Sequence, residues 1–479
     1  MRTAIDPRQR RVALLVAACM FMELLDATIV TTSAPSIARS LGVSAGGISL
    51  IITAYMVTLA TLIPASGWLS ARFGTRRVVL AAIATFTLAS LGCGLSQTLP
   101  ELIVMRVLQG VGGAMMVPVG RALVLSGSAK QNIMRLTAYL VWPALVAPVL
   151  APLAGGLITT YASWHWLFLI NLPLGAIALV VAARIVRPLP QGPPGKLDLV
   201  GGVLTCLGLA GLTVTLALLA DASSKWSVVL GGGLASLLFM ALAARHLLRT
   251  PAPLVDLRTL RIPTLRAAIS GTALYFPVMA AGPFLVPLML EEAFGWSAVK
   301  AGSIVLLIFV GNIGAKPATT YLYGRFGFRA VLVASTGLMA ATMVAIAFTA
   351  VSTPVAVIGA ILLLSGVARS VGATGYTTMA FGDVPKGRMR DASTLQATVQ
   401  QLGAGLGVAG GAIALRIGHS VGGLLSSKQG PATEYRVAFI LVALVALVAT
   451  AEAGRLHPGA GDVLRGGRAR QPAPADANA

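Results

Sequence analysis

Two carboxylates, Glu23 and Asp26, lie near the middle of an apolar stretch that covers residues 12–34. An ionised carboxylate at the centre of a membrane helix costs roughly 2.5–3.5 kcal/mol on insertion scales, so such a residue needs a functional reason. Their i, i+3 spacing puts both on one helix face, and we expect them to point together into a central cavity, where their charges repel. A carboxyl group held in this way can carry a proton down its gradient. The alternative for each is a structural hydrogen bond to a neighbouring helix.

Arg106 is the predicted partner of these acids. It lies about five residues inside the outer end of the apolar stretch 101–125, where its long side chain can reach Asp26 and form a buried ion pair. Protonation of Asp26 would break the pair and free the guanidinium, which makes a two-state switch. The alternative is that Arg106 extends to the outer membrane surface. Gln109 is expected to line the same cavity.

The second half of the chain carries membrane-embedded cations with few acids near them. We expect Lys316 and Arg369 to line the cavity and to favour anionic or carboxylate-bearing substrates. For Lys316, the alternative is a side chain that extends to the nearer membrane surface. Glu291 and Glu292 end another apolar stretch beside aromatic residues, and we expect them to be solvated, with proton uptake as the alternative.

The composition places these groups in a membrane protein. Of 479 residues, 56% are hydrophobic and 11% are charged, and the mean hydropathy is +0.85. The apolar stretches lack the alternation of a β-barrel, and no small-residue cleavage site follows the first one, so we expect retained helices throughout. Three cysteines in apolar segments predict neither a disulfide framework nor a metal site.

Apolar stretches of about 20 residues span the roughly 30 Å hydrocarbon core as helices. The sequence predicts fourteen of them, in an all-α polytopic fold of two six-helix bundles with two extra helices between them. The predicted spans are residues 12–34, 47–69, 78–98, 101–125, 136–160, 164–186, 198–219, 227–248, 266–290, 298–322, 330–350, 354–381, 393–418 and 435–454.

The distribution of the net charge of +21 predicts the orientation. With the amino terminus inside, 26 Lys and Arg residues fall in cytoplasmic segments, whereas the outer loops hold five. The positive-inside rule therefore places both termini in the cytoplasm. No basic stripe with interleaved aromatic residues remains, so we expect no nucleic-acid partner.

A repeated loop divides the chain. Residues 67–77 (GWLSARFGTRR) and 323–329 (YGRFGFR) share the pattern RFGxR at an offset of 253 residues, 325 minus 72, as expected of two parallel halves. Flanking Pro-rich segments mark the linkers. The predicted division is a cytoplasmic arm over residues 1–11, a first bundle over 12–187, linkers and two inserted helices over 188–265, a second bundle over 266–455, and a disordered cytoplasmic tail over 456–479.

The two loops are predicted to form a cytoplasmic gate. Their glycines allow close backbone approach, and their arginines can bind the carboxyl ends of helices or acidic groups. The gate residues are Gly67, Arg72, Gly74, Arg76, Arg77, Arg325, Gly327 and Arg329. In the fifth span, prolines remove backbone donors and a glycine pair lets another helix pack closely, which would limit leak. These residues are Pro148, Pro152, Gly155 and Gly156.

Several of these segments carry a resemblance to the major facilitator superfamily, in its fourteen-span drug:proton antiporter branch of EmrB/QacA type. Residues 25–30 (LDATIV) resemble the first-helix motif of that branch, and residues 67–77 resemble the cytoplasmic loop motif of the superfamily. Residues 106–114 (RVLQGVGGA) are similar to the fourth-helix motif. Residues 147–156 (APVLAPLAGG) and 163–173 (SWHWLFLINLP) resemble the fifth-helix antiporter motif and the segment after it.

Within that branch, residues 112–121 and 311–316 (GNIGAK) look most like the MdtD-type subgroup. The sequence departs from the family patterns at Ala71, where the loop motif usually carries Asp, and at Ala147 and Ala151, where the antiporter motif prefers Gly.

The resemblance implies a proton-coupled antiporter of the bacterial inner membrane that exports drugs or other small organic molecules by alternating access. It also implies no cofactor besides the proton motive force. The expected partners are a small-molecule substrate, protons and membrane lipid, with a periplasmic adaptor as an option, and the expected state is a monomer. The alternative is an exporter or proton symporter of an organic anion. An enzyme is not expected, because no nucleotide loop, metal-ligand spacing or nucleophile elbow occurs.

Overall fold

The computed structural model describes residues 6–43, 45–126, 132–187, 198–220, 226–251, 253–425 and 432–465. These residues form helices joined by turns and loops, without a strand among them, which confirms the predicted all-α class. The first half of the chain contains α1 (Pro7–Leu41), α2 (Ala45–Leu62), α3 (Ala65–Phe73), α4 (Thr75–Leu95), α5 (Leu99–Ser126), α6 (Ile133–Tyr161), α7 (Trp166–Leu169) and α8 (Asn171–Ile185). We call this group the N-half.

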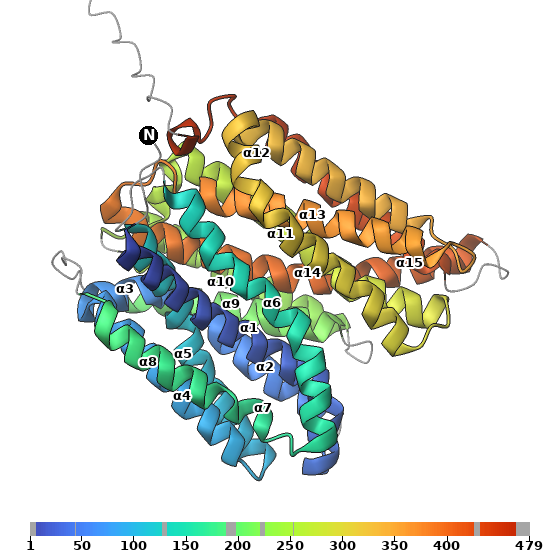
Figure 1. The fold of residues 1–479 in the computed structure, drawn as a ribbon, viewed down its shortest axis with the longest axis horizontal. Helices are drawn as coiled ribbons and strands as arrows, with labels where there is room; N and C mark the ends of the chain where they lie inside the picture. Colours follow the sequence, from blue (N-terminus) through green and yellow to red (C-terminus); the bar gives the residue numbers. More distant parts are fainter. Residues whose placement is uncertain are drawn as a thin grey trace, which may run out of the picture.

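The second half, called the C-half, contains α11 (Pro263–Leu288), α12 (Ala298–Ala347), α13 (Val355–Met379), α14 (Met389–Leu425) and α15 (Ala432–Gly454). Between the halves, α9 (Leu199–Ala220) and α10 (Trp226–Arg249) pack on one another, and α9 also contacts α2 and α14. Figure 1 shows the long helices of both halves running in roughly the same direction.

The helices begin and end where local chemistry allows. Asp6 caps α1 by accepting a hydrogen bond from the backbone N–H of Arg8, Pro7 occupies the first turn, and Gly42 ends the helix in the left-handed conformation. Pro64 separates α2 from α3, and the two helices meet at a bend of 61°. The span predicted over residues 47–69 is therefore bent.

Ten helices in the described part of the chain are long and apolar enough to cross a bilayer, or eleven when the bent α2–α3 pair is counted as one span. The long helix α12 contains a break at Gly327, whose φ is 82° and ψ 167°. The fold of a polytopic helical membrane protein is thus confirmed, whereas the number fourteen stays a prediction.

The ends of the chain differ in part from the predicted division. The first helix begins at Pro7, inside the predicted arm. Residues 456–465 of the predicted disordered tail include a short 3-10 helix, and Leu464 is buried beside Gly382 of the C-half. Residues 188–197, which hold most of the first Pro-rich linker, and 466–479 lie outside the described residues.

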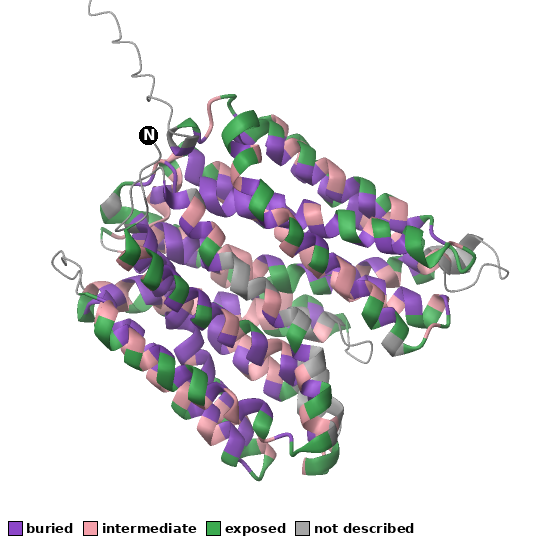
Figure 2. Cartoon of the chain, in the orientation of Figure 1, coloured by how far each residue is buried: buried purple, intermediate pink, exposed green. Residues whose placement is uncertain are grey.

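Large apolar side chains cover the outer faces of the helices. Leu88 of α4, Leu234 of α10 and Val448 of α15 are 67%, 69% and 55% exposed. Figure 2 shows such exposed residues along the outer helices and the buried residues between the helices. Exposed apolar surface on this scale is unusual for a soluble protein and fits contact with lipid.

Helices α12 and α13 pack closely, and glycine makes this possible. A Cβ atom added to Gly311 would overlap the backbone carbonyl of Leu363, and one added to Gly366 would overlap that of Ile308. Backbone cannot rotate away as a side chain can, so only glycine fits at these crossings. Gly314, one turn further along α12, is exposed and has no atom within 4 Å of its Cβ position.

Gly311→Ala is expected to destabilise the protein by about 1–3 kcal/mol, the usual range for overpacking. The measurement is the midpoint of thermal unfolding in detergent, with Gly314→Ala as the matched control in the same helix. The control should leave stability unchanged or raise it by up to about 1 kcal/mol, because alanine favours a helix more than glycine does. Equal unfolding midpoints for the two variants would contradict this account of the helix crossing.

Candidate functional site

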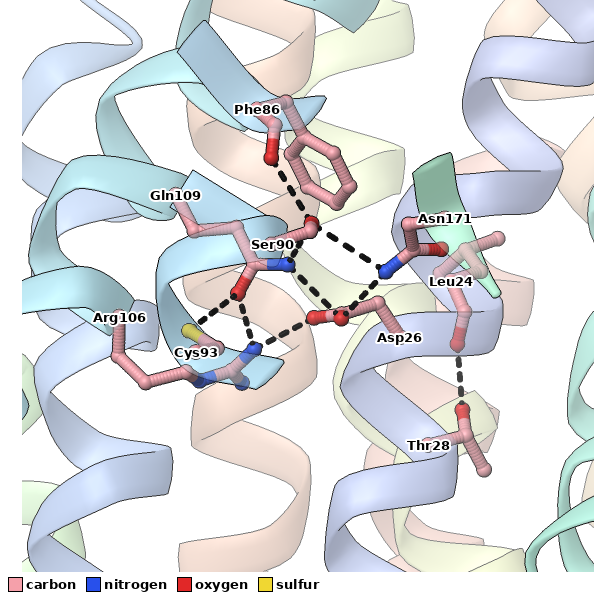
Figure 3. A network of polar contacts seen from close by, with 9 residues as sticks. All are labelled: Leu24, Asp26, Thr28, Phe86, Ser90, Cys93, Arg106, Gln109 and Asn171. Carbon is pink, nitrogen blue, oxygen red and sulfur yellow. Dashed lines mark hydrogen bonds and ion pairs between the residues drawn. The ribbon is translucent and has the colours of Figure 1, made fainter. Parts of the chain in front are cut away.

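Asp26 of α1 lies inside the N-half, in a polar network that also includes side chains of α4, α5 and α8 (Figure 3). Arg106 of α5 donates to Asp26 Oδ2 at 2.5 Å, Gln109 of the same helix donates to Oδ1 at 2.9 Å, and Asn171 of α8 donates to Oδ1 at 2.9 Å. Asp26 is 1% exposed and Arg106 is 0% exposed. The predicted buried ion pair is confirmed, and the alternative of an Arg106 side chain at the membrane surface is wrong.

Ser90 of α4 completes the network. Its Oγ donates to the carbonyl of Phe86 at 2.8 Å and accepts hydrogen bonds from Gln109 at 2.7 Å and from Asn171 at 3.4 Å. Gln109 Oε1 in turn accepts from Arg106 Nη1 at 2.7 Å. Gln109 therefore holds both members of the ion pair and fixes their relative position.

Every contact of the Asp26 carboxylate in this network is with a donor, as an ionised carboxylate requires. Aromatic rings surround the guanidinium: Tyr55 of α2 lies 4.3 Å from Arg106 Cζ, measured to the ring centroid, and Phe168 of α7 lies 5.8 Å away. The Nε atom of Arg106 is buried and has no hydrogen-bond partner among the described residues. Oδ2 accepts from Arg106 alone, so this oxygen keeps a lone pair for a proton, and protonation would remove the negative charge that Arg106 pairs with.

Glu23 points elsewhere, which corrects the prediction that both acids share one cavity. Asp26 turns into the interior of the N-half, whereas Glu23 lines a cavity between the two halves. Residues three apart on a helix differ by about 60° around its axis, and here that difference separates two environments. The two carboxylates still interact electrostatically, and Glu23 Oε2 is buried without a hydrogen-bond partner among the described residues.

The cavity has a volume of about 500 Å³ and mainly apolar walls. Its lining comes from α1 and α2 of the N-half, from α14 of the C-half and from Thr213 of the inserted helix α9. Glu23 is the one charged residue in this lining, which consists of Glu23, Leu24, Ala27, Ile52, Thr53, Tyr55, Met56, Leu59, Ala60, Thr213, Gln401, Leu402, Ala404, Gly405, Val408 and Ala409.

Lys316 and Arg369 do not belong to the lining of this cavity, and neither do Asp26, Arg106 and Gln109, all five of which the sequence had assigned to the substrate cavity. Lys316 is 3% exposed and donates to Thr374 at 2.6 Å inside the C-half, so the alternative of a surface-seeking lysine is wrong. All five residues are buried inside one bundle or the other, and none lies in the wall of the cavity between the bundles.

Arg369 binds a backbone carbonyl that a proline leaves without its helical hydrogen bond. It donates to the carbonyl oxygen of Met279 in α11. That carbonyl has no helical N–H partner, because the residue four positions later is Pro283. Met279 lies 253 residues after Asp26, which is the offset of the repeated loops, so the C-half has a methionine where the N-half has the carboxylate of the ion pair.

The two RFGxR loops have the same backbone design. Gly74 and Gly327, at equivalent positions, have φ values of 90° and 82°, in the region that favours glycine. Gly67 is buried, and a Cβ added to it would lie 3.1 Å from Thr394 Oγ1 of α14, so glycine permits close approach of the halves there. Arg76 donates to the carbonyl of Ala183 at 2.8 Å, in the last turn of α8, as predicted for a helix carboxyl end.

The other gate arginines lie on the surface near these turns. Their side chains are exposed; they are Arg72, Arg77, Arg325 and Arg329. Glu291 and Glu292 are also exposed, as the solvated interpretation expects, and Glu292 accepts a hydrogen bond from Tyr435.

The glycine pair of the fifth-helix motif lies in α6. Gly155 is buried, but Gly156 is exposed and has no atom within 4 Å of its Cβ position, so the close helix contact predicted at Gly156 is wrong for this arrangement. Pro148 and Pro152 also belong to α6, and their side chains lie outside the described residues.

Polar contacts between the halves gather on α14. Ser393 donates to the carbonyl of Pro118 at 2.9 Å, Ser66 and Thr394 share a hydrogen bond of 3.3 Å, and Arg121 of α5 donates to Gln400 at 3.1 Å. The contact from Ser66 lies beside Gly67, at the end of the bundle that carries the RFGxR loops. We call this the loop-motif end.

Sequence reasoning missed several of these polar residues. Asn171 stood in a quoted motif without a role, and Ser90 gave no signal, because a serine in an apolar helix is common. Arg121 carried the signal that revealed Arg106, an arginine within a predicted span, yet it was read as part of a resemblance.

Comparison with known proteins places this architecture in a family. Residues 16–408 match the sequence profile of the Major Facilitator Superfamily. A protein of Salmonella heidelberg (strain SL476) named MdtD, a name that assigns it to multidrug resistance, is 36% identical over 409 residues, covering 82% of this chain and 84% of the relative. The protein of that name from Salmonella paratyphi A (strain ATCC 9150 / SARB42) is 35% identical over 410 residues, covering 82% of this chain and 84% of that relative.

Solved structures share the fold. The human organic anion transporter MFSD10 superposes with a TM-score of 0.67 at 15% identity, covering 94% of this chain and 100% of that one. The proton:xylose symporter XylE gives a TM-score of 0.61 at 12% identity, covering 91% and 94%. With a family profile across most of its length and relatives above 30% identity, the chain belongs to the major facilitator superfamily and is a multi-pass membrane transporter rather than an enzyme.

Proposed function

We propose that this transporter is a proton-coupled antiporter that exports small organic molecules by alternating access. The observation that carries the proposal is that the two acids of α1 lie in different environments. Glu23 lies in the wall of a cavity formed by both halves, and Asp26 lies in a closed network with Arg106. An antiporter needs one carboxylate that substrate and protons can reach, and a second charged group that responds to it.

Coupling follows from the electrostatics of the two acids. They repel one another, so a charged Glu23 favours the protonated form of Asp26, whereas a proton or a cationic substrate at Glu23 favours the ionised form of Asp26. Protonation of Asp26 itself would release Arg106 from its carboxylate partner. We assign the loss of the Asp26–Arg106 ion pair to the step that switches the transporter between its inward-open and outward-open states.

The orientation comes from charge. By the positive-inside rule the loop-motif end faces the cytoplasm, together with both termini. The contacts of α14 with Pro118, Ser66 and Arg121 then close the cytoplasmic side in this arrangement. The bacterial inner membrane as the location, a monomeric state and an optional periplasmic adaptor belong to the same proposal.

The cavity favours uncharged or cationic substrates. Its walls are apolar and its single charged residue is an acid, whereas Lys316 and Arg369 lie apart from it. The names of the MdtD relatives, which assign them to multidrug resistance, support export. Export or import of an organic anion is the second candidate, because Lys316 and Arg369 are buried cations that donate to neutral oxygens, the hydroxyl of Thr374 and the carbonyl of Met279.

Asp26→Asn is expected to reduce proton-driven efflux to the level of empty vesicles. An amide cannot exchange the proton, and its NH₂ group would face the donors of Arg106 or Gln109. The measurement is uptake of a fluorescent lipophilic cation into inverted membrane vesicles under an imposed pH gradient, normalised to the amount of transporter in the membrane.

The matched control is Asp6→Asn, which makes the same chemical change at the exposed cap of α1, where an amide oxygen can still accept from Arg8. It should transport as the unsubstituted protein does. Full coupled transport by Asp26→Asn would remove Asp26 from the coupling step.

Substrate charge gives a second prediction. In proteoliposomes, tetraphenylphosphonium should release protons from the transporter, and Glu23→Gln should weaken its binding about tenfold, which is ~1.4 kcal/mol. A neutral drug should lose much less affinity in that variant. Proton movement that follows an aromatic carboxylate, and not the cation, would favour the organic-anion candidate.

A further inference from the structure

Arg121 is the one charged residue among the polar side-chain contacts that join the described parts of the N-half to α14. The other contacts join neutral groups: Ser393 with the carbonyl of Pro118, Ser66 with Thr394, and Gln401 with Met56. Arg121 Nη1 donates to Gln400 Oε1 at 3.1 Å. The strength of this contact can therefore respond to nearby charge, whereas that of the others responds far less.

Gln400 is held so that its oxygen faces Arg121. Its Nε2 atom donates to Thr377 Oγ1 of α13 at 3.1 Å, which leaves Oε1 for the guanidinium. The contact thus ties α5 of the N-half to both α14 and α13 of the C-half. Opening of this contact would leave Gln400 Oε1 without its donor.

Arg121 is poorly satisfied where it lies. It is 5% exposed, and its Nε atom is buried without a hydrogen-bond partner among the described residues. Its hydrogen bond to Gln400 is to a neutral amide, which does not balance the charge. A buried cation without an opposite charge is strongly unfavourable, so the stability of this arrangement depends on where the nearest negative charge lies.

That negative charge is Glu23. The two groups interact electrostatically without direct contact. Glu23 packs beside Gly113, whose Cβ position lies 3.7 Å from Glu23 Cδ, and Arg121 follows eight residues later on α5, about 12 Å along the helix axis. An arginine side chain in a helix leans toward the N-terminal end, which brings the guanidinium back toward Glu23.

Other titratable groups around Glu23 are few. Cys19 and Asp26 lie on the same helix, and Tyr55 approaches from α2. On α14, the residues in the cavity wall are uncharged. The other arginine of α5, Arg106, is paired with Asp26, so Arg121 is the buried cation of this helix that interacts with Glu23 without a carboxylate partner of its own.

We propose that Arg121 is a positioning residue that transmits the charge state of Glu23 to the contact between the halves. With Glu23 ionised, its charge balances Arg121 and the loop-motif end stays closed. When a proton or a cationic substrate neutralises Glu23, Arg121 is left as an unbalanced buried charge, and the contact with Gln400 opens. This inference rests on the proposed function, in that Glu23 is taken to bind protons or substrate.

A double-mutant cycle tests the inference on the full-length protein in nanodiscs. Spin labels are attached at Arg184→Cys on α8 and Arg455→Cys beyond α15, which are exposed positions at the loop-motif end of the two halves. Cys19, Cys93 and Cys206 are replaced by alanine. Double electron–electron resonance then gives the ratio of open to closed populations for the parent, Glu23→Gln, Arg121→Met and the double variant.

Glu23→Gln should raise the open-to-closed ratio by roughly 5- to 150-fold in the parent, the usual range for coupled sites. In the Arg121→Met background, the same change should alter the ratio by less than about twofold, as for independent sites. An equal effect of Glu23→Gln in both backgrounds would overturn the inference.

Gln400→Leu provides a second arm if Arg121→Met does not fold. It removes the contact and keeps both charges, so Glu23→Gln should again have little effect; a full effect there would also overturn the inference. The measurement requires no transport. Loss of coupled efflux in Asp26→Asn and coupling between Glu23 and Arg121 are thus separate results, and either can fail alone.

Discussion

Charges in a low-dielectric interior must be balanced, and in this protein the balance is struck inside the N-half, between Asp26 and Arg106. Four helices supply the network around this pair: α1, α4, α5 and α8. The ion pair is stable only while Gln109, Asn171 and Ser90 keep their places, so it constrains how these helices pack. A change in the charge of Asp26 would be felt by all of them.

Glu23 and Asp26 face different environments, and this difference links the buried ion pair to transport. One carboxylate faces a cavity built by both halves, and the other faces the interior of one bundle. The residues between the halves are mostly neutral and gather on α14, where small contacts such as Ser66 with Thr394 can form and break at little energetic expense. Arg121 is the exception, since its charge is buried at the interface. The C-half has no counterpart of the Asp26 carboxylate at Met279, so the two halves differ in chemistry while sharing the backbone design of their loops.

The sequence was sufficient for the fold class, for the Asp26–Arg106 pair and for the choice of Gly74 and Gly327 as motif residues, whose positive φ only the structure shows. The fold class follows from the length of the apolar stretches, the ion pair from charged residues within them, and the glycines from the repeated RFGxR motif. The cavity could not be derived in the same way, because i, i+3 spacing leaves an angle of about 60° between Glu23 and Asp26, and only helix packing decides that this angle separates them. Ser90 and Gly156 show the same limit, since the environment of a small residue depends on which helix lies opposite it.

The central claim is that Asp26 exchanges its partner between Arg106 and a proton during transport. Infrared difference spectroscopy can follow this exchange directly in the purified protein, because a protonated carboxyl has a carbonyl band that a carboxylate lacks. We expect acidification to produce such bands, addition of tetraphenylphosphonium to remove them, and Asp26→Asn and Glu23→Gln each to delete one. If no carboxyl band changes, or if the bands persist unaltered in Asp26→Asn, Asp26 keeps its charge throughout and the account of coupling is contradicted.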